Sequence, residues 1–244
     1  MPVILIHGFP LTGDIWKSQI EVLSSKARVI APDLRGFGKS EVTDGTYFME
    51  LFAHDLKILL DELGIEKAVL AGISMGGYIA FAFHKLFPSS VRALILLDTK
   101  PGADSEQGKK GRFDLAQKAR SGKMEQIADE WAGRLFAPST TKTRPDVVRT
   151  VRDAIFHTSP EAIANASLGM MERQDSTPLL REISCPVLIM TGDHDRIAPV
   201  EEAQAMAAGI KGSRVEVIEN AGHLTCLEAP EQVNSLLLDF LSRV

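Results

Sequence analysis

Short runs of apolar, mostly β-branched residues alternate along the chain with stretches whose apolar residues recur at helical spacing. Six such runs predict strands, at 3–7, 27–33, 67–73, 92–98, 186–192 and 214–220. Because these runs are almost continuously Val, Ile and Leu, they fit strands that are covered on both faces. The alternation therefore predicts an α/β fold with a mostly parallel twisted sheet flanked by helices.

Helical spacing predicts helices between these strands. In 46–63 the apolar residues recur every three or four positions, and Gly64 follows as a glycine cap. Further helices are predicted at 76–87, 199–209 and 229–242, where Pro199 and Pro230 suit first-turn positions.

Residues 100–180 interrupt the alternation. They show no strand pattern, only helical stretches at 113–121, 123–136, 145–156 and 160–172. We interpret 100–180 as a helical cap inserted into an α/β core that comprises 1–99 and 181–244.

Composition narrows the class of protein. The chain has 244 residues, 45% of them hydrophobic, and a net charge of −5, which disfavours a nucleic-acid partner. No apolar stretch is long enough to span a membrane, and no basic segment precedes the first strand, so we expect a cytoplasmic protein. Cys185 and Cys226 predict two buried thiols at opposite edges of the sheet, with no disulfide between them. The oligomeric state is not predicted.

The segment "GISMGGY" at 72–78 follows a predicted buried strand and opens a predicted helix. Serine and glycine are poor helix formers, so propensity does not explain their presence here. A tight turn that raises one side chain above a sheet needs flanking residues without bulk, which Gly72 and Gly76 provide. The pattern G-x-S-x-G therefore favours Ser74 as a nucleophile.

Partners for such a serine follow two later strands. Asp193 and Asp195 come after one strand, and His223 comes after the next. The carboxyl ends of parallel strands meet at one edge of a sheet, so these side chains should lie near Ser74. Asp98 ends another strand and is a further candidate for the acid, whereas His7 suits a structural, hydrogen-bonded role.

The chain resembles the α/β-hydrolase family, in which serine, acid and histidine come in this order. The resemblance depends on "HGFP" at 7–10, "DLRGFGKS" at 33–40, "GISMGG", "GDHDRIAP" and "AGH". It implies Ser74 as nucleophile, His223 as base and Asp195 as acid, because Asp195 matches the family pattern G-x-x-D-x-x-x-P. It also implies an oxyanion hole formed by the backbone N–H groups of Met75 and of Phe9 or Gly8. Family members usually begin with an antiparallel strand pair, which we expect to be missing here.

The branch that it resembles includes small carboxylesterases and 3-oxoadipate enol-lactonases. Apolar side chains in the cap, among them Trp131, Leu135 and Phe136, are candidates to line the pocket. We therefore expect a serine esterase that forms an acyl-enzyme with small, mainly apolar esters and needs no metal or cofactor. The alternatives are an enol-lactone hydrolase, a C–C bond hydrolase or a perhydrolase with the same triad, or a ligand-binding receptor. Four arginines of the cap could bind a substrate carboxylate: Arg112, Arg134, Arg144 and Arg173.

Overall fold

One six-stranded sheet forms the centre of the molecule, and every neighbouring pair of strands is parallel. The computed structural model describes all residues, 1–244. The strands are β1 (Pro2–Ile6), β2 (Arg28–Ile30), β3 (Ala68–Ile73), β4 (Val91–Leu97), β5 (Val187–Gly192) and β6 (Arg214–Ile218), in the spatial order β2-β1-β3-β4-β5-β6. The predicted parallel α/β sheet is therefore confirmed.

All six predicted strands occur, but their lengths depend on their place in the sheet. The central strands β3 and β5 are buried along their whole length. β2 lies at one edge, pairs with β1 through only three residues and is half-exposed. The prediction of a seven-residue strand at 27–33 was therefore wrong, because an edge strand extends only as far as its single neighbour pairs with it.

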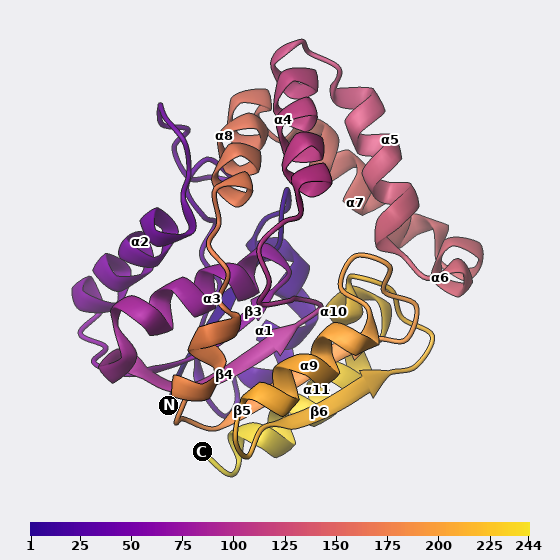
Figure 1. Cartoon of the computed structure of the whole chain (residues 1–244). Coiled ribbons are helices and arrows are strands. Elements are labelled where there is room, and N and C mark those ends of the chain that lie inside the picture. Colours follow the sequence, from indigo (N-terminus) through magenta and orange to yellow (C-terminus); the bar gives the residue numbers. More distant parts are fainter.

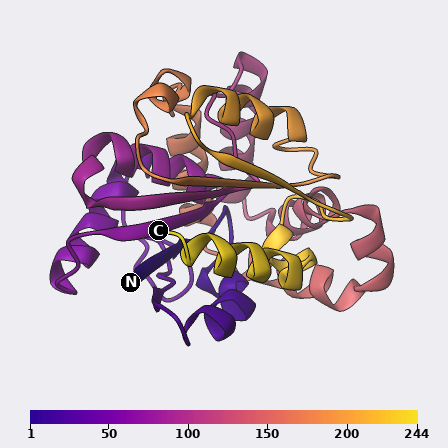
Figure 2. The ribbon, with the colours of Figure 1, turned by 90° about the horizontal axis from the view of Figure 1, so that it is seen from below.

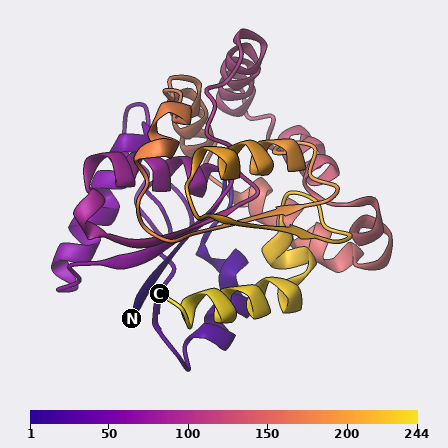
Figure 3. The same ribbon diagram turned by 60° about the horizontal axis from the view of Figure 1, so that its bottom comes forward.

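Helices cover both faces of the sheet. Two of them, α1 (Lys17–Leu23) and α11 (Pro230–Leu241), pack together on one face. The other face carries α2 (Met49–Glu62), α3 (Met75–Leu86) and α9 (Val200–Gly209) (Figures 2 and 3). Three short helices were not predicted, since seven residues or fewer show little periodicity: α1, α6 (Pro138–Thr143) and α10 (Thr225–Glu228).

Residues that the sequence placed at helix ends mostly have that role. Gly64 follows Leu63, the C-cap of α2, and has a φ of +66°, as a glycine cap requires. Pro230 is the first residue of α11. Pro199 is the residue before α9 rather than a residue of its first turn, so that prediction was wrong by one position.

Five helices occupy residues 106–171, and this part of the chain, the helical segment, contains no strand. They are α4 (Glu106–Arg120), α5 (Met124–Leu135), α6, α7 (Pro145–His157) and α8 (Pro160–Met171). α4 packs on α8, and α5 packs on α7. The segment lies beyond the carboxyl ends of the strands (Figure 1). α4 begins seven residues before the predicted 113, because the Ser105 side chain accepts a hydrogen bond from the Gly108 N–H and caps the helix.

Both cysteines are free thiols. Cys226 is fully buried, as expected, whereas Cys185 is only half-buried because it lies just before β5, at the amino edge of the sheet. Among the helices, none combines the length and the apolar character that crossing a membrane would require.

Candidate active site

The turn between β3 and α3 holds Ser74 in a strained conformation. Its φ is 54° and its ψ is −115°, a region that residues other than glycine rarely adopt. A Cβ at position 72 would overlap the carbonyl of Gly76, and a Cβ at position 76 would overlap the carbonyl of Ile6. The two glycines therefore let the chain turn sharply enough to raise the serine side chain above the end of the strand.

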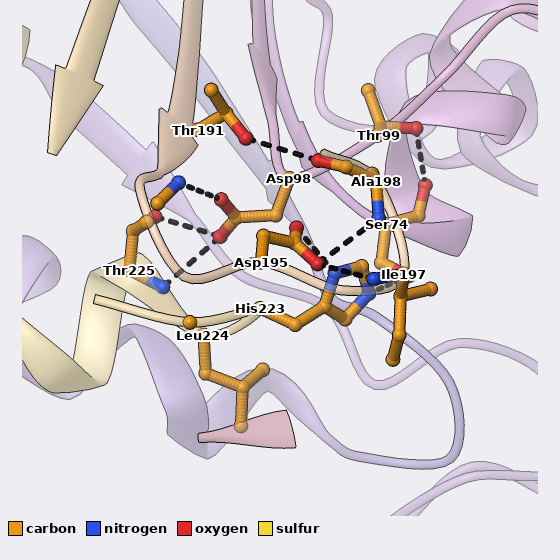
Figure 4. Close-up of polar contacts among 12 residues, drawn as sticks. Ser74, Asp98, Thr99, Thr191, Asp195, Ile197, Ala198, His223, Leu224 and Thr225 are labelled. Carbon is orange, nitrogen blue, oxygen red and sulfur yellow. Dashed lines mark hydrogen bonds and ion pairs between the residues drawn. The ribbon is translucent and has the colours of Figure 1, made fainter. Parts of the chain in front are cut away.

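Three side chains from different parts of the sequence meet at this turn (Figure 4). The Ser74 Oγ lies 2.7 Å from Nε2 of His223, and the Nδ1 of the same ring lies 2.7 Å from Oδ2 of Asp195. With its proton on Nδ1, the ring donates to Asp195 and accepts from the Ser74 hydroxyl. This arrangement allows the serine to pass its proton to the histidine as it attacks a substrate.

The surroundings of His223 favour its protonated form. Burial of the ring lowers its pKa, but the carboxylates around it, Asp195 first and then Asp98 and Glu228, together more than offset this effect, so the pKa lies above the usual 6.5. Asp195 is itself buried, and its second oxygen accepts hydrogen bonds from the N–H groups of Ile197 (2.7 Å) and Ala198 (3.0 Å). Both oxygens of the acid are therefore occupied, which fixes the carboxylate against the ring.

The two other candidate acids have different contacts. Asp193 is exposed and accepts a hydrogen bond from the Ala221 N–H at 3.1 Å. Asp98 is completely buried and accepts from the Gly192 N–H and from both the N–H and the hydroxyl of Thr225. Burial raises its pKa to about 7. Neither carboxylate forms a hydrogen bond with His223, so the structure brings only Asp195 to the ring.

The turn after β1 lies against Ser74. A Cβ added at Gly8 would lie 3.3 Å from the Cβ of Ser74. The N–H groups of Gly8 and Phe9 donate to no acceptor in the protein, and Met75, as the first residue of α3, has no acceptor within its helix. All three N–H groups are thus available to a substrate oxygen.

His7 supports this turn. Its Nδ1 donates to the Gly8 carbonyl at 3.0 Å, and its Nε2 accepts from the Leu34 N–H at 3.0 Å. Complete burial lowers its pKa to about 4, so the ring is neutral at physiological pH. The expected structural role agrees with these contacts.

The three candidate pocket residues at the end of α5 and directly after it lie in different places. The ring of Trp131 packs edge-on against Phe9, with 5.3 Å between ring centroids. Trp131 also lines a cleft of about 780 Å³ between α4, α5 and the loop that carries Asp195. Leu135 and Phe136 are buried and do not line this cleft. Leu135 instead contacts the site through its backbone, because its carbonyl accepts the His223 N–H at 2.8 Å.

Three of the four candidate arginines have partners within the protein. Arg112 pairs with Asp104 at 2.9 Å, Arg144 donates to the Leu227 carbonyl, and Arg173 donates to the carbonyls of Pro101 and Gly102. Arg134 forms no ion pair, and its guanidinium lies over the Trp131 ring, 5.8 Å from the centroid.

Two residues near the site escaped the sequence analysis. Arg196 lines the same cleft as Arg134 and likewise forms no ion pair. Because it directly follows Asp195 in the sequence, its position near the site could have been predicted. Glu228 accepts four hydrogen bonds around the loop that carries His223. Nothing in the pattern "HLTCLE" distinguishes it from a surface glutamate. Across the chain, no three His, Cys, Asp or Glu side chains converge to hold a metal ion.

A parallel sheet with a strained serine, a histidine and an aspartate at its carboxyl edge defines a protein of the α/β-hydrolase class. The model of the family described as alpha/beta hydrolase fold matches residues 1–230. The solved structure of a thermophilic esterase from Thermogutta terrifontis, with malate bound, is 45% identical and superposes with a TM-score of 0.98. This similarity covers 100% of this chain and 90% of that one.

Two curated relatives extend the comparison. The 3-oxoadipate enol-lactonase 2 of Acinetobacter baylyi is 32% identical over 90% of this chain and 80% of its own length. A putative non-heme chloroperoxidase of Synechocystis is 33% identical over 98% of this chain and 91% of its own length. The chain belongs to the α/β-hydrolase fold family.

Proposed function

We propose that this protein is a carboxylic ester hydrolase that works through an acyl-enzyme on Ser74. The observation that carries the proposal is the continuous hydrogen-bond path from Ser74 through His223 to Asp195. The fold family and the similarity to an esterase structure support hydrolase activity.

In the proposed first step, the Ser74 hydroxyl gives its proton to Nε2 of His223 while Oγ bonds to the ester carbonyl carbon. The carbonyl oxygen becomes an oxyanion, which the N–H groups of Met75 and Phe9 would stabilise. When the intermediate collapses, the bond to the alcohol oxygen breaks, and His223 returns the proton to the leaving alcohol. A water molecule then loses a proton to His223 while its oxygen bonds to the acyl carbon. When this second intermediate collapses, the bond between the acyl carbon and Ser74 Oγ breaks, His223 returns the proton to Ser74 Oγ, and the acid is released.

The helical segment supplies the proposed substrate cover. Phe9 and Trp131 form an apolar surface beside the N–H groups that would bind the oxyanion. We propose that residues 100–180 act as a cap and that the cleft between α4, α5 and the loop of Asp195 admits a small-molecule ester.

A panel of p-nitrophenyl esters, from acetate to octanoate, tests this function together with a fluorophosphonate probe that labels activated serines. We expect turnover that is greatest for short acyl chains, and labelling at Ser74. Labelling without turnover of any ester would instead favour a ligand-binding receptor on this fold. If the protein is not labelled and turns over no ester, the proposed site is contradicted.

A second candidate substrate class is supported by the cleft. Arg134 and Arg196 line it without ion-pair partners, and a relative 32% identical is an enol-lactonase. Guanidinium groups bind carboxylates well, so an ester or lactone that carries a carboxylate would be accommodated there. A comparison of mono- and dimethyl succinate distinguishes the two classes. If the wild type prefers the monoester and the double variant Arg134→Gln/Arg196→Gln loses this preference, substrates with a carboxylate are favoured. If the wild type prefers the diester, neutral esters are favoured.

Activity should fall on the acid side of neutrality. His223 must be neutral to accept the serine proton, and its pKa lies above the usual 6.5 because the nearby carboxylates, Asp195 foremost, together outweigh the effect of burial. We therefore expect kcat/KM to decrease as the pH falls, with the midpoint of this acid limb above 6.5. A pH–rate profile with p-nitrophenyl butyrate, assayed with correction for the ionisation of p-nitrophenol, measures it. A midpoint clearly below 6.5 would contradict the pairing of His223 with Asp195.

Replacing the acid should separate the two neighbouring aspartates. Asp195→Asn removes the charge that orients and supports the His223 imidazolium, so we expect kcat to fall by about 10³- to 10⁴-fold. Asp193→Asn is the matched control. It keeps an oxygen that can accept from the Ala221 N–H, so kcat should change less than about threefold. Steady-state kinetics of both variants measure these effects. If Asp193→Asn lowered kcat more than Asp195→Asn, Asp193 rather than Asp195 would be the acid.

A further inference from the structure

The segment that carries His223, residues 220–228, comprises a turn and α10, and it is hydrogen-bonded to the helical segment and to Asp98 at the end of β4. We call it the histidine loop. Its His223 N–H donates to the Leu135 carbonyl at 2.8 Å, at the end of α5. The two backbones are in direct contact, because a Cβ added at Gly222 would lie 2.7 Å from the Ala137 nitrogen. The position of the base therefore depends on residues outside the α/β sheet.

One carboxylate, that of Glu228, organises this contact. Its Oε1 accepts from the Gly222 N–H (2.8 Å) and the Leu224 N–H (3.3 Å), the residues on either side of His223. Its Oε2 accepts from the Ala137 N–H (2.8 Å) and the Thr140 hydroxyl (2.7 Å), at the junction of α5 and α6. Four donors thus converge on one side chain, two from each of the segments that it joins.

The remaining contacts at this junction strengthen the same connection. The Arg144 guanidinium, from the start of α7, donates to the carbonyls of Leu227 (2.9 Å) and Glu228 (3.1 Å). Hydrogen bonds in which the donor or the acceptor is charged are about twice as strong as those between neutral groups. The histidine loop and the α5–α6 junction should accordingly behave as one rigid unit.

We propose that Glu228 is a positioning residue for His223, which holds the ring at bonding distance from Ser74 by fixing the peptides on both sides of it to the α5–α6 junction. This inference rests on the proposed function and adds that the helical segment contributes to catalysis by placing the base. Misplacement of a catalytic group by about 1 Å can lower a rate by about 100-fold, so the expected effect lies in kcat.

Glu228→Gln tests the proposal with little change of shape. The amide keeps one acceptor oxygen but turns an NH₂ group toward two of the four donors, so one pair of hydrogen bonds is lost. We expect kcat to fall by about 10- to 100-fold with KM changed less than about threefold. Glu231→Gln is the matched control, because Glu231 is exposed on α11 and should leave both constants unchanged. A Glu228→Gln protein that folds and keeps kcat within twofold of the wild type overturns the proposal.

A second variant covers the case in which Glu228→Gln does not fold. Thr140→Val removes only the hydroxyl donor on the side of the helical segment and keeps the side-chain shape. We expect kcat to fall severalfold while the melting temperature stays within about 2 °C of that of the wild type. If both variants fold, their effects should be non-additive in the double variant, since they act through the same carboxylate. Additive losses, or a loss confined to KM, would overturn the proposal.

The rate of labelling by a fluorophosphonate separates this proposal from the proposed ester hydrolysis. Phosphonylation of Ser74 needs His223 as base but no ester substrate. A slower labelling rate in Glu228→Gln than in Glu231→Gln supports positioning even if no ester is turned over. If the two variants are labelled at equal rates and the wild type turns over esters normally, the hydrolase function stands and the role of Glu228 is overturned.

Discussion

Ser74→Ala should lower kcat for p-nitrophenyl butyrate by at least about 10⁴-fold. The Ser74 Oγ lies 2.7 Å from Nε2 of His223, so in the proposed mechanism this hydroxyl loses its proton to the ring and bonds to the carbonyl carbon. The oxyanion N–H groups and substrate binding remain, so a small residual rate above that in water is expected. Steady-state kinetics and loss of fluorophosphonate labelling measure the effect.

The fold should survive this change. Alanine occupies the same strained conformation, φ 54°, and only one hydrogen bond is lost, so the free energy of unfolding should change by about 1 kcal/mol at most. Ser74→Gly removes the same hydroxyl and also relieves the strain, so it should unfold at a higher temperature than Ser74→Ala. Ser184→Ala, at an exposed serine, is the control for activity. Retention of more than a tenth of the wild-type kcat in Ser74→Ala would rule out this serine as the nucleophile.

Gly169→Ala should destabilise the protein although alanine is the better helix former. Gly169 lies within α8, and an added Cβ would overlap the carbonyl of Tyr47. Tyr47 cannot move aside easily, because it is fully buried and its hydroxyl donates to the Thr43 carbonyl at 2.7 Å. Overpacking against backbone costs about 1 to 3 kcal/mol, and we expect a loss of about 2 to 3 kcal/mol in the free energy of unfolding. Urea denaturation measures this value.

Gly133→Ala makes the same substitution in another helix of the segment. A Cβ at this position of α5 meets nothing within 4 Å, so only helix propensity acts. This variant should gain about 0.5 to 1 kcal/mol. If Gly169→Ala and Gly133→Ala both gained stability, α8 would not pack against Tyr47 as the structure shows. If both variants lost stability, helix propensity would not govern the effect at position 133.

Features that depend on neighbouring residues in the sequence were predicted accurately, whereas features that depend on distant segments were not. The central strands were predicted within a residue or two because runs such as 68–73 are apolar on both faces, a property that the segment itself carries. The length of β2 depends on its one neighbour, and the start of α4 depends on the Ser105 cap. Boundaries of this kind come from contacts that a window of sequence does not contain.

The candidate site shows the same division at the level of side chains. The places of Ser74, His223 and the candidate aspartates after strands predicted that these side chains meet, and the resemblance to the α/β-hydrolases selected Asp195 among them. Which residues of α5 reach the cleft was not predictable, because Trp131 and Leu135 are both apolar and four positions apart. Only the packing of α5 turns the first toward Phe9 and leaves the second to hold His223 through its carbonyl.

Hydrophobic periodicity along the sequence predicted the parallel sheet, and the glycines around Ser74 predicted the nucleophile, because both signals act over a few neighbouring positions. The resemblance to the α/β-hydrolases added Asp195 and His223 as the other two residues of the proposed triad. The tertiary structure alone decided which arginines remain unpaired in the cleft and which carboxylate holds the histidine loop. Those properties depend on donors and acceptors from segments about 90 residues apart, such as Ala137 and Glu228, that only the folded chain brings within hydrogen-bonding distance.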